Sequence, residues 1–201
     1  MIKIGLDLDN TIIIYDKLFK KIAIEENLVP IEIEPTKYAI REHLRKTNRE
    51  NEFTILQSIV YGKRILDAEL AIGFLDFLNK VDHRIELYII SHKTMFPIKG
   101  ERFNLHKAAM SFLSEKKIIG SSQNRIKESN IFFEATIKEK LNRISKLNCN
   151  YFIDDLPKII NDIDSKTIPI LYNPNRITYK KSNYDQLFNW KNLHEKINYT
   201  Y

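Results

Sequence analysis

The order in which strand-like and helix-like segments follow one another is the feature that most constrains the fold of this chain. After about residue 69, short apolar runs typical of buried strands alternate with amphipathic helical patterns. The strand-like runs are "RIELYIISHK", "NIFFEA", "CNYFIDD" and "TIPILYN", and the helical patterns are "ELAIGFLDFLNKV", "NLHKAAMSFLSEKK", "IKEKLNRISKL" and "PKIINDI". This alternation is typical of a parallel sheet with helices on both faces, so we predict a three-layer α/β fold.

A helical segment interrupts this alternation after the first strand. The N-terminal run "MIKIGLDL" is predicted to be a strand buried on both faces. Between Tyr15 and Glu69 the chain has helical patterns broken at Pro30 and Pro35, and no strand-like run. We therefore predict an α/β core formed by residues 1–14 and 70–201, and a small helical cap formed by residues 15–69.

The composition is that of a soluble globular protein. The chain is 43% hydrophobic and 29% charged, and no apolar run approaches the roughly 18 residues that a membrane span needs. The segment "MIKIGLD" lacks the features of a secretory signal, and the single cysteine, Cys149, cannot form an internal disulfide. We therefore expect a cytoplasmic protein. The net charge is +6, but scattered lysines without an Arg-rich block argue against a nucleic-acid partner.

Two pairs of aspartates follow predicted strands. Asp7 and Asp9 come at the end of the first strand, and Asp154 and Asp155 end the run "YFIDD". Because ligands of an open parallel sheet bind at the C-terminal ends of its strands, we expect the four carboxylates to meet at one place. Their mutual repulsion would raise their pKa values, and a divalent cation would relieve it. Ligands that offer only oxygen, without a cluster of His or Cys, favour Mg²⁺.

The segment "GLDLDNT" resembles the DxDxT signature of the haloacid-dehalogenase-like (HAD) hydrolase superfamily, most of whose members are phosphatases. Further landmarks of that superfamily follow in the same order: a Ser that ends an apolar strand in "YIISHK", a Lys near the start of a helix in "IKEKL", and an acidic pair in "FIDDLP". The resemblance extends from Ile2 to about Asn173, outside the inserted helices. It implies a Rossmann-like core, with the insertion as a cap that sets specificity.

The resemblance also implies a role for the residues of these motifs. Asp7 would be the nucleophile that takes up the phosphoryl group, and Asp9 would protonate the leaving oxygen and then activate water. Ser91 would donate a hydrogen bond to a phosphate oxygen. Mg²⁺ would bind Asp7, the main-chain carbonyl of Asp9, and Asp154, with Asp155 bound directly or through water.

A lysine would neutralise the charge of the nucleophile and the phosphate, and the sequence offers two. Lys140 is favoured because Ile144 would face the core one helical turn later, whereas Lys138 is nearer to the preceding strand. His92 and Lys93 directly follow the proposed phosphate-binding serine. His92 is a candidate phosphate ligand, and Lys93 could hold a second anionic group; the alternative for both is a solvated loop.

Together these observations predict a Mg²⁺-dependent phosphatase that hydrolyses a small phosphomonoester, such as a sugar phosphate or a nucleotide, through an aspartyl-phosphate. Two alternatives stay open. One is a nucleotidase or phosphoryl transferase on the same fold, and the other is a non-catalytic regulatory protein that keeps the motifs as a phosphate or metal site. Neither the identity of the substrate nor the oligomeric state follows from the sequence.

Overall fold

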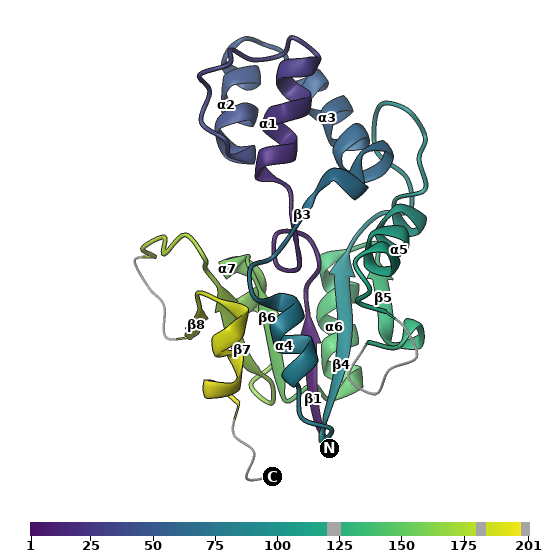
Figure 1. Ribbon diagram of the computed structural model, residues 1–201, viewed down its shortest axis with the longest axis vertical. Helices are drawn as coiled ribbons and strands as arrows, with labels where there is room; N and C mark the ends of the chain where they lie inside the picture. Colours follow the sequence, from purple (N-terminus) through teal and green to yellow (C-terminus); the bar gives the residue numbers. More distant parts are fainter. Residues whose placement is uncertain (120–125, 180–183, 198–201) are drawn as a thin grey trace. The chain divides into compact units, whose positions relative to one another are not determined.

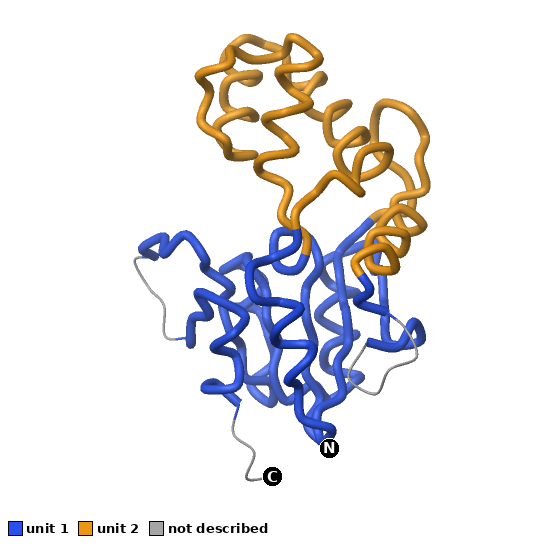
Figure 2. Tube along the Cα trace, in the orientation of Figure 1, with its two compact units in different colours: residues 1–12, 70–93, 117–201 blue, residues 13–69, 94–116 orange. Residues whose placement is uncertain are grey.

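The computed structural model describes residues 1–119, 126–179 and 184–197 of the chain. The chain divides into two compact units (Figure 2). We call residues 1–12, 70–93 and 117–201 the sheet unit, and residues 13–69 and 94–116 the helical unit. Two short strands, β2 (Ile13–Ile14) and β3 (Glu69–Leu70), form a separate two-stranded sheet. The ranges of the helical unit, residues 13–69 and 94–116, are separate in the sequence.

The sheet unit is built around a parallel sheet of six strands, in the order β5-β4-β1-β6-β7-β8 (Figure 1). Leu6 pairs with Ile89 on one side and with Ile153 on the other, so β1 is central. Because every pair in this sheet is parallel, the C-terminal ends of the strands lie at one edge. The predicted α/β fold is thus confirmed. The strands are β1 (Ile2–Leu6), β4 (Ile85–His92), β5 (Ile131–Glu134), β6 (Tyr151–Asp154), β7 (Ile168–Tyr172) and β8 (Asp185–Leu187).

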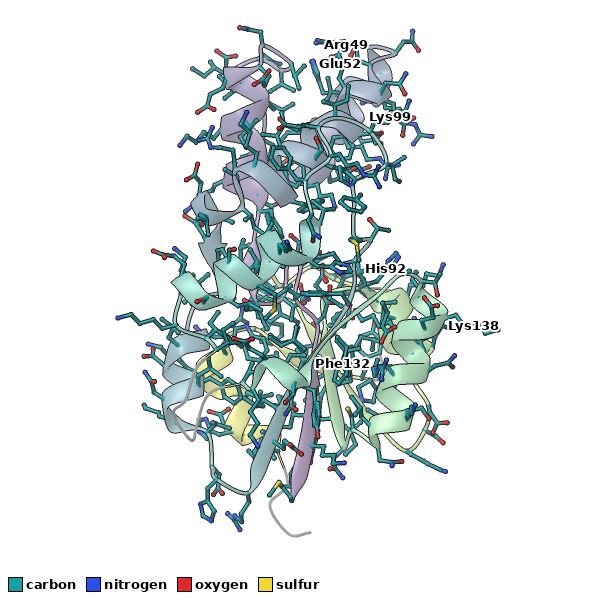
Figure 3. The ribbon with its side chains drawn as sticks, turned by 90° about the vertical axis from the view of Figure 1, so that its right-hand side faces the viewer. Arg49, Glu52, His92, Lys99, Phe132 and Lys138 are labelled. Carbon is teal, nitrogen blue, oxygen red and sulfur yellow. The ribbon has the colours of Figure 1, made fainter. Side chains whose placement is uncertain are left out.

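Helices cover both faces of this sheet, as Figures 1 and 3 show for α4 and α6. On one face, α6 (Ile137–Leu147) and α7 (Pro157–Asn161) pack on the strands through one hydrophobic cluster. The buried members of that cluster are Tyr88, Ile90, Ile144, Cys149, Phe152 and Ile159. On the other face lies α4 (Phe74–Lys80). A short 3₁₀ helix, η3 (Glu128–Asn130), precedes β5.

The C-terminal segment completes the second face through Trp190. Trp190 begins the 3₁₀ helix η4 (Trp190–Glu195) and is fully buried. Its ring lies 4.8 Å from that of Phe74 and 5.6 Å from those of Phe77 and Tyr172, measured between centroids. Its indole N–H donates a hydrogen bond to the carbonyl of Thr11 at 3.0 Å. The end of the chain is therefore tied to the loop that follows β1.

Two features of the sheet unit differ from the sequence-based expectation. The helix predicted over residues 69–81 begins only at Phe74, because Gly73 has a φ of 81° and residues 69–70 form β3. A left-handed backbone is easily adopted by glycine and cannot continue a right-handed helix. In addition, β8 and η4 lie beyond the last predicted strand. With three residues, β8 is too short to produce a recognisable alternation.

The helical unit has a core of its own, built from α1 (Asp16–Glu25), α2 (Lys37–Lys46), α3 (Glu50–Ser58) and α5 (Leu105–Glu115). The Thr36 hydroxyl caps α2, accepting a hydrogen bond from the N–H of Ala39 at 3.1 Å. An aromatic cluster, with ring centroids 4.8 to 5.9 Å apart, consists of Tyr15, Phe19, Phe53 and Tyr61. No helix in the described part of the chain is long and apolar enough to cross a membrane.

Residues 52–66, within the stretch predicted to be helical, do not form one continuous α-helix. After α3 the backbone forms a π-helix, η1 (Ile59–Lys63), and then a 3₁₀ helix, η2 (Ile65–Asp67). The prediction rests on apolar residues that recur about every 3.6 positions, and this period does not indicate where an α-helix changes to a π-helix or a 3₁₀ helix. The division also assigns residues 94–116 to the helical unit, whereas the sequence-based division placed them in the core. They pack there closely, since a Cβ atom on Gly62 would lie 2.7 Å from the Cβ of Phe103.

Candidate functional site

Three aspartates meet where β1 and β6 end. Asp7 directly follows β1, and its N–H donates a hydrogen bond to the Ile153 carbonyl at 2.8 Å, which holds the two strand ends side by side. Asp154 is the last residue of β6 and is fully buried, and Asp155 follows it. Carboxylate oxygens of the three residues lie within 4.8 Å of one another. The parallel topology therefore brings together acidic residues that are far apart in the sequence.

Lys140 lies between two of these carboxylates. Its ammonium donates to Asp7 Oδ1 at 2.5 Å and to Asp154 Oδ2 at 2.6 Å, and its side chain is only 2% exposed. The start of α6 is fixed by a capping box, in which the Thr136 hydroxyl accepts from the N–H of Glu139 while the Glu139 carboxylate accepts from the N–H of Thr136. The helix therefore delivers the lysine to the site in a defined position.

Lys138, the second lysine considered from the sequence, does not reach these carboxylates. It is exposed, and Figure 3 shows its side chain pointing outward from α6. Two residues along a helix correspond to a rotation of about 200°, so Lys138 and Lys140 cannot face the sheet together. The helix-face argument thus selects the lysine that the structure places beside Asp7.

Burial sets the electrostatics of the site. Burial raises the pKa of Asp7 to about 7, and neighbouring carboxylates add to this effect while Lys140 opposes it. Burial likewise raises the pKa of Asp154, and burial together with the charges of Asp7 and Asp154 raises the pKa of Asp155 well above its ordinary value. Burial alone would lower the pKa of Lys140, but the two bonded carboxylates outweigh it and raise that pKa. The lysine is therefore charged at neutral pH.

The donor set fits a hard divalent cation. Asp7, Asp154 and Asp155 offer only oxygen, and their oxygens are close enough to share one ion. The remaining contacts orient these ligands, since Asp154 Oδ1 accepts from the N–H of Leu156 at 2.9 Å and Asp155 Oδ1 accepts from the Thr11 hydroxyl at 3.4 Å. A cation bound there would also offset the mutual repulsion of the three carboxylates.

The end of β4 places Ser91 and His92 differently. Ser91 is buried, and its hydroxyl has no hydrogen-bond partner among the described residues, which makes it available to a ligand. His92 is exposed, and its Nε2 lies 3.1 Å from the carbonyl of Ala135. Successive residues of a strand point to opposite faces, so the structure brings Ser91 toward the interior and does not bring His92 to the carboxylates.

Lys93 follows the same alternation and is buried like Ser91. Its ammonium donates to both carboxylate oxygens of Asp9, at 2.7 and 3.0 Å. The site thus contains two separate ion-paired groups, Lys140 with Asp7 and Asp154, and Lys93 with Asp9. With all groups ionised, four carboxylates and two ammonium groups leave two formal negative charges, which one divalent cation would balance.

The comparisons with known proteins find similarity in structure and not in sequence. The sequence matches no family model and no curated protein. The structure is similar to a proposed phosphoglycolate phosphatase from Lactobacillus plantarum, with a TM-score of 0.57 and 13% identity over 98% of this chain and all of the other. It is also similar to the proposed HAD hydrolase YfnB of Bacillus subtilis, a structure bound to magnesium, with a TM-score of 0.55 and 12% identity over 98% of each chain. A 2-haloacid dehalogenase from Pseudomonas syringae gives a TM-score of 0.52 and 11% identity over 97% of each chain.

The chain has the HAD-like fold. In this HAD-like fold, the ends of β1, β4 and β6 carry the aspartates and Ser91, and α6 supplies Lys140. The sequence alone did not identify Lys93 as the partner of Asp9, nor the contact between Thr11 and Asp155. The alternation of side chains along a strand could have indicated that Lys93 faces the interior, because it stands two residues after Ser91.

Proposed function

We propose that this protein is a Mg²⁺-dependent phosphatase that hydrolyses a small phosphomonoester through an aspartyl-phosphate on Asp7. The observation that carries the proposal is the acidic cluster at the ends of β1 and β6, in which Asp7 and Asp154 are buried and bonded to Lys140 and Asp155 is half-buried. A buried carboxylate beside a fixed ammonium group and two further acidic oxygen donors suits the charge of a transferring phosphoryl group.

In the proposed first step, a carboxylate oxygen of Asp7 attacks phosphorus, and the bond from phosphorus to the leaving oxygen breaks. Asp9 gives its proton to that oxygen, so the product leaves as an alcohol. Lys140 donates to Asp7 and keeps its carboxylate in place, and the buried Ser91 hydroxyl is proposed to donate to a phosphate oxygen. Mg²⁺ held by Asp7, Asp154, Asp155 and the main-chain carbonyl of Asp9 would supply charge neutralisation.

In the proposed second step, Asp9 takes a proton from water, whose oxygen attacks the phosphorus of the aspartyl-phosphate. The bond between phosphorus and the Asp7 oxygen breaks, inorganic phosphate leaves, and both aspartates return to their starting state. Two carboxylates with different neighbours can divide these tasks. Asp7 is buried beside Lys140, whereas the Asp9 side chain is 22% exposed and held by Lys93.

The test is a phosphate-release screen with Mg²⁺ over sugar phosphates, nucleotides and small acid phosphates. Wild type should release phosphate from at least one compound, and Asp7→Asn should lose all measurable turnover while remaining folded. Asp162→Asn is the matched control, because it removes an exposed carboxylate from the same unit and should keep wild-type activity. The proposal fails if folded wild type turns over nothing, or if Asp7→Asn stays active.

The proposed substrate is a small phosphorylated metabolite, and the helical unit is proposed to determine which one. Its positive charges, such as Lys37, whose ammonium donates to the Tyr61 hydroxyl at 2.6 Å, are suited to a sugar phosphate or a nucleotide. The same screen, repeated with and without an acceptor alcohol, separates hydrolysis from phosphoryl transfer, because only a transferase forms a new phosphomonoester.

A further inference from the structure

Lys93 is held rigidly at the end of the central strands. Its N–H donates to the carbonyl of Glu134 at 2.9 Å, which continues the parallel ladder of β4 and β5 by one residue beyond the pair of His92 and Glu134. Its side chain is only 3% exposed. Burying an ammonium group is costly unless it is paired and hydrogen-bonded, so the position of this lysine depends on its partner.

That partner is the carboxylate of Asp9, which Lys93 contacts through both oxygens. Asp9 lies beyond the end of β1, and its neighbour Asn10 has a φ of 59°, so the chain turns there. Since β1 and β4 are adjacent strands with Leu6 opposite Ile89, their C-terminal extensions lie next to each other. The side chain of Lys93 spans the distance between them.

We propose that Lys93 is a positioning residue that fixes the carboxylate of Asp9 for its proton transfers. The inference rests on the proposed function, because it concerns how Asp9 performs its part of that reaction. A carboxylate held through both oxygens has a fixed plane, and each oxygen keeps a further lone pair that can accept a proton. General acid–base catalysis needs the acting oxygen within hydrogen-bond distance of the proton it moves, and a single held orientation satisfies this need.

A double-mutant cycle between the two residues tests this role. Lys93→Met should lower kcat at least tenfold for an alkyl phosphate in the wild-type background. In the Asp9→Asn background the same change should lower the remaining activity less than twofold, because there is no carboxylate left to position. Lys158→Met, which removes an exposed lysine from the same unit, should leave kcat unchanged in both backgrounds. Equal losses from Lys93→Met in both backgrounds would refute the proposal.

The leaving group provides a second readout that a merely structural role would not change. An aryl phosphate releases a stable anion that needs no proton, whereas an alkyl phosphate needs one. In single-turnover experiments, Lys93→Met should therefore slow the first step at least tenfold for the alkyl phosphate and less than threefold for the aryl phosphate. A similar loss for both substrates would overturn the proposal. If Lys93→Met does not fold, Lys93→Gln replaces it in both experiments with the same criteria.

The failure of this inference can be distinguished from the failure of the proposed function. If Asp7→Asn abolishes phosphate release but the effects of Lys93→Met and Asp9→Asn multiply, only the role of Lys93 is wrong. If Asp7→Asn retains activity, the proposed function itself is wrong. Fluorescence of Trp190, which is buried in the sheet unit, checks that each variant keeps its fold.

Discussion

The affinity of the site for Mg²⁺ should depend strongly on pH, because protons and the metal compete for the same carboxylates. Burial raises the pKa of Asp7 to about 7 in the metal-free protein. The metal binds the ionised carboxylate, so affinity falls as the pH falls through that value. Asp7 would be about 3% ionised at pH 5.5 and about 90% ionised at pH 8, which predicts binding about 30-fold weaker at the lower pH.

Isothermal titration calorimetry with MgCl₂ at pH 5.5 and pH 8 measures this difference directly. At saturating Mg²⁺ the 30-fold change corresponds to about 2 kcal/mol less stabilisation at pH 5.5, which thermal unfolding also reports. The raised pKa values of Asp154 and Asp155 act in the same direction and strengthen the dependence on pH. Asp7→Asn should bind Mg²⁺ more weakly and with less dependence on pH. An affinity that is equal at both pH values in wild type would refute the electrostatic reasoning.

Two further predictions concern the stability of the sheet unit. Lys140→Met removes a buried ammonium and leaves the carboxylates of Asp7 and Asp154 uncompensated, so at pH 8 without metal the free energy of unfolding should fall by about 3–5 kcal/mol. Lys138→Met, on the exposed side of α6, should change the free energy of unfolding by less than about 0.5 kcal/mol. Urea unfolding measures both variants, and similar losses would contradict the assignment of Lys140 as the lysine paired with Asp7 and Asp154. Gly5→Ala should lower the free energy of unfolding by about 1–3 kcal/mol, because the added Cβ would lie 2.5 Å from the buried ring of Phe152. An unchanged melting temperature would contradict this and show that β1 and β6 can move apart without a loss of stability.

Much of the fold could be predicted from local patterns, because several elements are specified by their own residues. The helix predicted over residues 137–147 coincides with α6, where an amphipathic pattern follows a capping box formed by Thr136 and Glu139. By contrast, β8 has three residues, and its pairing with β7 depends on tertiary contacts that no short window contains. The late start of α4 depends on the left-handed conformation of Gly73, which composition alone does not reveal.

The candidate site was predictable to the extent that strand ends and helix faces determine it. Asp7 and Asp154 could be placed together because parallel strands end at one edge, and Lys140 could be preferred because of its position on the helix. The arrangement after Ser91 depends on where β4 ends. Since the strand continues through His92 and its ladder reaches Lys93, the lysine faces inward and the histidine outward.

Detection of the covalent intermediate tests the central claim most directly. Wild type would be mixed with a phosphomonoester that it turns over in Mg²⁺, quenched within the first turnover, reduced with borohydride and digested with trypsin. Reduction converts an aspartyl-phosphate to homoserine, which mass spectrometry locates within the peptide of residues 4–17. The proposed mechanism predicts homoserine at position 7 in wild type and none in Asp7→Asn. Turnover without modification at Asp7, or modification at Asp9 instead, would contradict it.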